Sequence, residues 1–253
     1  MKALVTGASS GIGRDIAREL SARGCGLILT ARRKDRLEQL ARELKTDTRV
    51  LPADLSNRKD CFSLYEQVKT ENIDILVNSA GFGVFGPFDE TSLERELDMI
   101  DVDLCALHIL TKLFYLDFKK RNSGYILNIA SSAAFQPGPL LSSYYAAKAY
   151  VLRLTEALAE ELRRDGSRVY IGALCPGPVE TEFDAVANVR FSVRGLSSRE
   201  VARYAVKKML ERKTVIVPGT LMKAARFAER FLPEKVIVRA AYHMQHRKTR
   251  PAK

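Results

Sequence analysis

The sequence contains few cysteines, and none has the spacing of a metal site or a disulfide framework. The four lie at positions 25, 61, 105 and 175, each in an apolar or helix-like segment. No pair has Cys-x-x-Cys or zinc-ligand spacing, so we expect no metal site. Free, mostly buried thiols in a reducing compartment are the expected state of these residues.

Long hydrophobic runs and a leader segment are also missing. No stretch reaches the roughly 18 uninterrupted apolar residues of a membrane-spanning helix. Residues 1–7 lead directly into a strand-like segment, without a charged leader and cleavage site, so we expect a cytoplasmic protein. A content of 46% hydrophobic and 28% charged residues excludes a disordered chain. The length of 253 residues suits one α/β domain, and no repeat or linker divides it.

The net charge of +11 is concentrated in the last quarter of the chain. Residues 186–253 hold 17 Lys and Arg against 4 Asp and Glu, whereas residues 1–185 hold 24 against 26. Such a segment suits an anionic partner, or it is simply a solvated surface.

Short β-rich segments alternate with helix-like segments up to about residue 217. Strands are expected at 2–6, 26–30, 49–52, 73–78, 125–129, 169–174 and 214–217. Helices are expected at 13–23, 34–44, 58–71, 92–121 and 144–164. A further helix is expected to begin at the Ser-x-x-Glu capping box of residues 197–200 and to end at about residue 211; residues 91–94 have the form of a capping box as well. This alternation predicts one α/β domain over residues 1–219, with a mostly parallel sheet and helices on both faces. Residues 220–253 are expected to form a basic helical extension, not an independent domain, with helices at 220–231 and 234–244.

A glycine-rich turn directly follows the first strand. Gly7, Gly11 and Gly13 let the backbone turn tightly and approach a phosphate, and the next helix presents free N–H groups. Between a first strand and a first helix this pattern predicts a pyrophosphate site, although a plain glycine-rich turn is the alternative. The predicted contacts are Gly7, Ser9, Ser10, Gly11, Ile12 and Gly13.

The second strand ends in two arginines, where an NAD site usually has a carboxylate. Arg32 and Arg33 suit the 2′-phosphate of NADP(H), which an acid would repel. We therefore predict NADP(H) as the cofactor, with Arg32 as the main contact and Arg33, Ser9 and Arg14 as helpers. Arg33 is also consistent with a solvated charge at a helix start.

Two later strand ends carry further candidate contacts. Asp54, followed by Leu55, suits the adenine amino group, or else it caps the next helix. In Asn78-Ser79-Ala80-Gly81, the small residues Ala80 and Gly81 let the backbone pass beneath a ribose, while Asn78 can tie neighbouring strands.

A tyrosine and a lysine four residues apart are the candidate reacting groups. Tyr144 and Lys148 share one face of a helix-like segment. A nearby ammonium lowers the pKa of a phenol from about 10, which makes Tyr144 a candidate general acid–base. Ser131, just past the fifth strand, is a candidate to hold the substrate oxygen, and Ser132 competes for that role. Taken alone, the Tyr-x-x-x-Lys spacing is common by chance.

Together these motifs resemble the short-chain dehydrogenase/reductase family over about residues 1–219. The order of residues 6–13, 78–81, Ser131 with Tyr144 and Lys148, and 176–181 carries the resemblance. It implies a seven-stranded Rossmann sheet and hydride transfer between a nicotinamide and a carbonyl or alcohol carbon. It further implies Tyr144 as acid–base, Ser131 as substrate anchor, and Lys148 as pKa shifter and nicotinamide-ribose ligand. The implied nicotinamide contacts are Pro176, Gly177, Val179 and Thr181, and the implied assembly is a homo-oligomer, a dimer or tetramer, through 92–121 and 144–164.

The sequence departs from the family pattern at two positions. Ser79 replaces the second Asn of Asn-Asn-Ala-Gly, a small change that we expect to be tolerated. Asp103 stands where the family often has an Asn, eight residues before Thr111, that positions a water in a proton relay to the Lys. We predict a working but retuned relay, since a carboxylate accepts from that water and can pair with Lys148; the alternative is a surface Asp without a catalytic role.

No motif identifies the substrate. Its contacts are expected from 83–88, 136–141 and 181–194. The first two segments contain apolar residues that suggest an apolar pocket or merely cover the cofactor: Val84, Phe85, Phe88, Leu140 and Leu141. The third contains apolar residues that suggest a mobile lid: Phe183, Val186, Val189 and Phe191. Arg190 and Arg194 suit a carboxylate or phosphate, and equally a solvated surface.

The basic extension has three interpretations. We favour a helix pair packed on the core over an oligomer interface and over peripheral contact with an anionic membrane. Nucleic acid is not expected as a partner, because no groove-binding or stacking motif accompanies the charge. The sequence thus predicts an NADP(H)-dependent oxidoreductase acting on a small, partly apolar carbonyl or alcohol substrate. A non-catalytic NADP(H)-binding protein, attached to a membrane through this extension, is the alternative.

Overall fold

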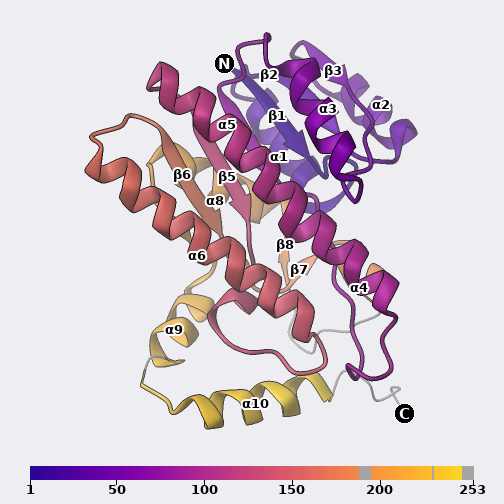
Figure 1. Ribbon diagram of the computed structural model, residues 1–253, viewed down its shortest axis with the longest axis vertical. Helices are drawn as coiled ribbons and strands as arrows, with labels where there is room; N and C mark the ends of the chain where they lie inside the picture. Colours follow the sequence, from indigo (N-terminus) through magenta and orange to yellow (C-terminus); the bar gives the residue numbers. More distant parts are fainter. Residues whose placement is uncertain (188–194, 230, 247–253) are drawn as a thin grey trace.

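Seven parallel strands form one sheet in the order β3-β2-β1-β4-β5-β6-β9 (Figure 1). This computed structural model describes residues 1–187, 195–229 and 231–246. The strands are β1 Lys2–Thr6, β2 Gly26–Thr30, β3 Thr48–Val50, β4 Ile75–Asn78, β5 Tyr125–Ile129, β6 Tyr170–Leu174 and β9 Val215–Ile216. Their nearly continuous apolar sequences are explained by burial on both faces of the sheet. The predicted parallel sheet is confirmed.

Helices cover both faces of this sheet. The helices are α1 Gly11–Ser21, α2 Lys34–Glu43, α3 Arg58–Val68, α4 Leu93–Ile100, α5 Leu107–Arg121, α6 Ser142–Arg164, α7 Phe183–Val186, α8 Ser198–Leu210, α9 Thr220–Glu229 and α10 Glu234–His246. Apolar residues of α1, α2 and α8 pack on one face, and those of α3, α5 and α6 on the other. The result is the predicted three-layer α/β architecture.

The long helical segment predicted at residues 92–121 contains a π-helical turn. Helix α4 passes into η1, a π-helix over Asp101–Ala106, and then into α5. The capping box predicted at Thr91–Glu94 is wrong by one residue, because Ser92 is the N-cap and its hydroxyl accepts from the Arg95 N–H at 3.3 Å. The box at Ser197–Glu200 does form and begins α8.

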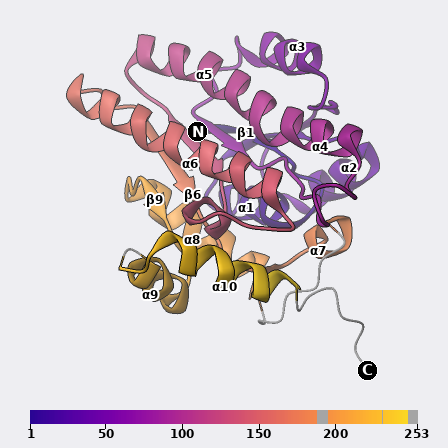
Figure 2. The ribbon, with the colours of Figure 1, turned by 60° about the horizontal axis from the view of Figure 1, so that its bottom comes forward.

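The chain turns at Gly219, whose φ is 82°, and continues into α9 and α10. Both helices lie at the lower edge of the molecule in two views (Figures 1 and 2). A short pair, β7 Val179–Glu180 and β8 Leu196–Ser197, stands beside the main sheet. Part of the predicted substrate lid, with Val189, Arg190, Phe191 and Arg194, lies outside the described residues. The predicted boundary after residue 219 stays a prediction.

Candidate active site

The carboxyl ends of the strands open into one large pocket, of about 640 Å³. Nearly all predicted cofactor contacts line it: Gly7, Ser9, Ser10, Gly11, Ile12, Gly13, Arg32, Arg33, Asp54, Leu55, Ala80, Gly81, Tyr144, Lys148, Pro176, Gly177, Val179 and Thr181. Asn78 does not line it, since its buried amide donates to Thr111 Oγ1 at 3.0 Å and Asn128 Oδ1 at 2.9 Å. Asn78 therefore ties β4 to α5 and β5 behind the pocket.

The glycine turn is built for close approach of a ligand to the backbone. Gly7 has a φ of 66°, and a Cβ there would lie 2.7 Å from the backbone of Ser79 and Ala80. A Cβ on Gly13 would lie 2.6 Å from the Gly7 carbonyl oxygen. The N-cap of α1, Ser10, makes no side-chain cap bond, which leaves N–H groups of the first turn for a phosphate. These features fit a dinucleotide pyrophosphate.

The two arginines after β2 differ in their surroundings. Arg33 donates to Glu182 Oε2 at 2.8 Å and to Ser9 and Ser10 hydroxyls. Arg36, from the first turn of α2, pairs with the same Glu182 carboxylate. Among the described residues, Arg32 is exposed and has no ion-pair partner. The sequence did not predict that Glu182 and Arg36 lie beside Arg33, because only the fold brings residues 33 and 182 together.

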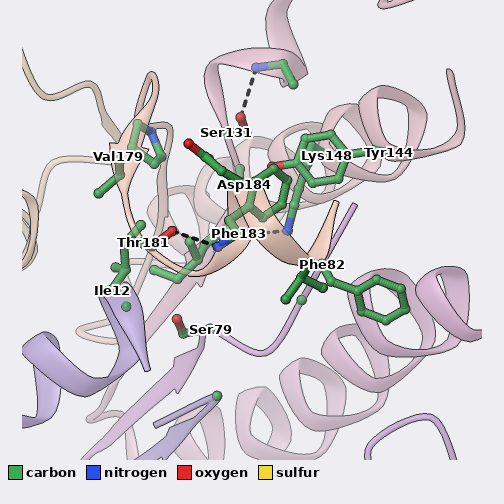
Figure 3. Close-up of a pocket in the computed structure, with 18 of the residues that line it drawn as sticks. Ile12, Ser79, Phe82, Ser131, Tyr144, Lys148, Val179, Thr181, Phe183 and Asp184 are labelled. Carbon is green, nitrogen blue, oxygen red and sulfur yellow. Dashed lines mark hydrogen bonds between the residues drawn. The ribbon is translucent and has the colours of Figure 1, made fainter. Parts of the chain in front are cut away.

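Tyr144 and Lys148 project from α6 into the pocket, with Ser131 nearby at the end of β5 (Figure 3). Ser131 is the N-cap of η2, a 3₁₀-helix over Ser132–Phe135, and its hydroxyl oxygen accepts from the Ala133 N–H at 3.1 Å. This bond uses only the oxygen of Ser131, and the hydroxyl also interacts with the Tyr144 hydroxyl, which lowers the pKa of Tyr144. The Tyr144 ring lies 5.3 Å from the ring of Phe183.

Lys148 and Asp103 form a buried ion pair. Lys148 Nζ lies 3.0 Å from Asp103 Oδ2 and donates to the Ile129 carbonyl oxygen at 3.2 Å. Asp103 Oδ1 accepts from the Phe82 N–H at 2.9 Å, and the residue is fully buried within η1. The alternative of a surface Asp is therefore wrong. Asp103 does not itself line the pocket.

The pKa values of this cluster reflect competition between burial and charge. Burial disfavours the Lys148 ammonium, but the attraction of Asp103 outweighs it, so the pKa of Lys148 is raised. Desolvation raises the pKa of Tyr144, while Lys148 and the Ser131 hydroxyl lower it and Asp103 raises it. Lys148 acts in the predicted direction, but the net shift is upward, so Tyr144 stays protonated near neutral pH.

Helices α9 and α10 close one side of the pocket. Leu221, Met222, Ala225 and Glu229 of α9 line it together with Ala241, Met244 and Gln245 of α10. The Gln245 amide donates to the Tyr145 hydroxyl at 2.6 Å, which fastens α10 to α6. The favoured interpretation of residues 220–253 placed two helices on the core, but it did not predict that they line the pocket. Amphipathic spacing shows that a helix has an apolar face, but it does not show what that face covers.

Of the other predicted substrate contacts, Gln136, Leu141, Phe183 and Val186 line the pocket, as does Ser132, the competitor of Ser131. Val84, Phe85, Phe88 and Leu140 do not, and Phe88 is largely exposed. The apolar wall comes instead from Phe82, Leu141, Phe183 and the C-terminal helices.

A family model for short chain dehydrogenases matches residues 1–190. The chain belongs to this family. It is 38% identical over 183 residues to an uncharacterized oxidoreductase of Staphylococcus epidermidis, covering 71% of this chain and 78% of that one. Among solved structures, a short-chain dehydrogenase from Sphingobium yanoikuyae in complex with NADPH has a TM-score of 0.83 at 29% identity, covering 100% of this chain and 97% of that one. A serine dehydrogenase complexed with NADP⁺ has a TM-score of 0.77 at 30% identity, covering 86% and 94%. The protein is thus a short-chain oxidoreductase that uses a nicotinamide cofactor.

Proposed function

We propose that this protein reduces apolar ketones or aldehydes with NADPH. The observation that carries the proposal is one pocket that joins two chemistries. At one end are the glycine turn and Arg32, which has no ion-pair partner in the part of the chain that the structure describes, and at the other are Ser131, Tyr144 and Lys148. The NADPH and NADP⁺ complexes of the two similar structures support the choice of cofactor.

The residues present fit this cofactor. The glycine turn and the first turn of α1 would hold the pyrophosphate, and Arg32 would hold the 2′-phosphate, which a guanidinium binds well. Asp54, Lys148 and residues 176–181 would hold the adenine, ribose and nicotinamide. The bound cofactor supplies the hydride, and the protein supplies the proton and the orientation of the carbonyl group.

The proton chemistry follows from the cluster. Because the Tyr144 phenol is protonated, it can donate its proton to a carbonyl oxygen that the Ser131 O–H also holds. Lys148, kept charged by Asp103, stabilises the phenolate that remains. Reduction begins from the protonated phenol, whereas oxidation of an alcohol would need the phenolate. The wall of Phe82, Leu141, Met222 and Met244 favours an apolar group beside that carbonyl. The cytoplasmic location and the homo-oligomer stay predictions.

The test is NADPH oxidation measured against a panel of ketones, aldehydes and diketones. We expect turnover with apolar members and at least a hundredfold loss of kcat in Tyr144→Phe, because positioned acid–base catalysis contributes about 10²–10⁴-fold. Tyr150→Phe is the matched control, since Tyr150 lies on the same helix outside the pocket and pairs with His108. Tight NADPH binding without turnover on the whole panel would instead indicate a cofactor-binding protein.

A further inference from the structure

The outward surface of α9 and α10 is rich in exposed aromatic and aliphatic side chains. Phe227 is 62% exposed and Phe231, just after α9, is 73% exposed, with their rings 5.2 Å apart. Leu232 and Val236 extend this surface to the start of α10. Soluble surfaces seldom gather large apolar groups in this way, so the cluster indicates an interaction surface.

The same segment carries a strong positive charge. Residues 220–253 contain nine Lys and Arg and only two Asp and Glu. Lys235 and Arg239 of α10 are exposed, and neither has an ion-pair partner within the described ranges. One of the two acids, Glu229, lines the pocket, where burial raises its pKa. The other acid, Glu234, is exposed in the first turn of α10, so the cations of this segment still outnumber its acids.

The apolar surface continues into the pocket. Leu221 is 70% exposed and Met244 55% exposed, although both line the pocket, so they form its rim. The Gln245–Tyr145 hydrogen bond fixes α10 at this rim. Exposed apolar side chains thus occur both on the outward surface and at the rim of the pocket.

We propose that the outward surface of α9 and α10 docks on an anionic phospholipid bilayer. Amphipathic helices with basic and aromatic side chains lie in the plane of such an interface, bound by apolar burial and by attraction to anionic lipids. None of the helices in the described ranges has the length and hydropathy to cross a membrane. A second copy of the chain fits this surface poorly, because a two-fold contact would bring cations against cations.

Docking gives the proposed reductase a route to its substrate. Apolar carbonyl compounds partition into membranes, and the rim of Leu221 and Met244 would face that reservoir. This route depends on the proposed function, whereas the docking itself depends only on the surface.

The test is co-sedimentation of the full chain with vesicles, with and without NADPH. Vesicles of phosphatidylcholine alone are compared with vesicles that also contain phosphatidylserine or phosphatidylglycerol. We expect binding only to the anionic vesicles, and its loss as salt rises from about 0.1 M to about 0.5 M. Lys235→Glu with Arg239→Glu should lower the partition coefficient by about tenfold or more. Phe227→Ser with Phe231→Ser should do the same by removing apolar burial.

Lys45→Glu with Lys120→Glu is the matched control, because both residues are exposed and lie outside α9 and α10. This pair should leave vesicle binding unchanged. No binding to anionic vesicles, or equal losses in the control, would overturn the proposal. So would a concentration-dependent dimer in sedimentation velocity that Phe227→Ser with Phe231→Ser abolishes. NADPH oxidation with a water-soluble ketone, measured in the same samples, shows separately whether the proposed activity is present.

Discussion

At the scale of single residues, Asp103 is the group that most distinguishes this site from the family pattern. It lies in the π-helical turn η1, where its carboxylate contacts both the Phe82 N–H and the Lys148 ammonium. Removing one partner of a buried pair usually costs more than the pair contributes, so Asp103 and Lys148 depend on each other. The carboxylate also raises the pKa of Tyr144.

Replacement of Asp103 by Asn should move the pH dependence of reduction to lower pH. Reduction requires the protonated Tyr144 and therefore declines as pH rises through the pKa of this phenol. With Lys148 still protonated, Asn removes a negative charge that raises that pKa, so the decline should begin at lower pH. A decline that begins at higher pH would show that Lys148 loses its charge together with Asp103. The measurement is kcat/KM for reduction as a function of pH, with protein folding checked by circular dichroism.

Asp101→Asn is the matched control for this variant. Asp101 lies in the same π-helical turn, but it pairs with Arg58 at the surface, 3.1 Å away. Its replacement should leave the pH profile in place. If Asp103→Asn also left the profile unchanged, Asp103 would have no part in the proton chemistry.

At the scale of elements, the capping box of α8 should make a measurable contribution to the stability of the protein. The Ser197 hydroxyl accepts from the Glu200 N–H at 3.3 Å, and Glu200 Oε2 accepts from the Ser197 N–H at 3.1 Å. Ser197→Ala should lower the free energy of unfolding by about 1 kcal/mol, as measured by urea denaturation. Ser63→Ala, at an exposed position inside α3, should leave it within about 0.5 kcal/mol. Equal losses in the two variants would mean that the box does not stabilise α8.

Elements that rest on local periodicity could be predicted from the sequence. The strands at residues 2–6, 26–30 and 125–129 have the predicted bounds, because both-face burial demands continuous apolar runs. The π-helical turn at 101–106 could not be predicted, since its apolar spacing is that of an ordinary helix. Thr91 and Ser92 both fit an N-cap, and only the entry of the chain into α4 selects Ser92.

At the scale of the whole molecule, the candidate site divides into a predictable and an unpredictable part. The predictable part consists of residues at strand ends or on the face of one helix, which a parallel sheet brings together at its carboxyl edge. These residues are Gly7, Arg32, Ser131, Tyr144 and Lys148. The side formed by α9 and α10 depends on where the chain returns after Gly219, which no local pattern encodes. The contact between Glu182 and Arg33 joins segments 149 residues apart, and it has a consequence for cofactor binding.

Glu182→Gln should tighten the binding of NADPH. The carboxylate pairs with Arg33 and Arg36 beside the pocket, which also holds its pKa below the ordinary value. Without that negative charge, both guanidiniums are free to attract a 2′-phosphate, so the Kd of NADPH should fall by about three- to tenfold. The Kd of NADH should stay the same, because NADH lacks this phosphate. Glu38→Gln is the control, since the one ion pair of Glu38 within the described ranges is with Lys34, on the same helix. Titration of the cofactor by fluorescence measures both constants, and a weaker affinity for NADPH in Glu182→Gln would show that the carboxylate instead holds the arginines in position for the phosphate.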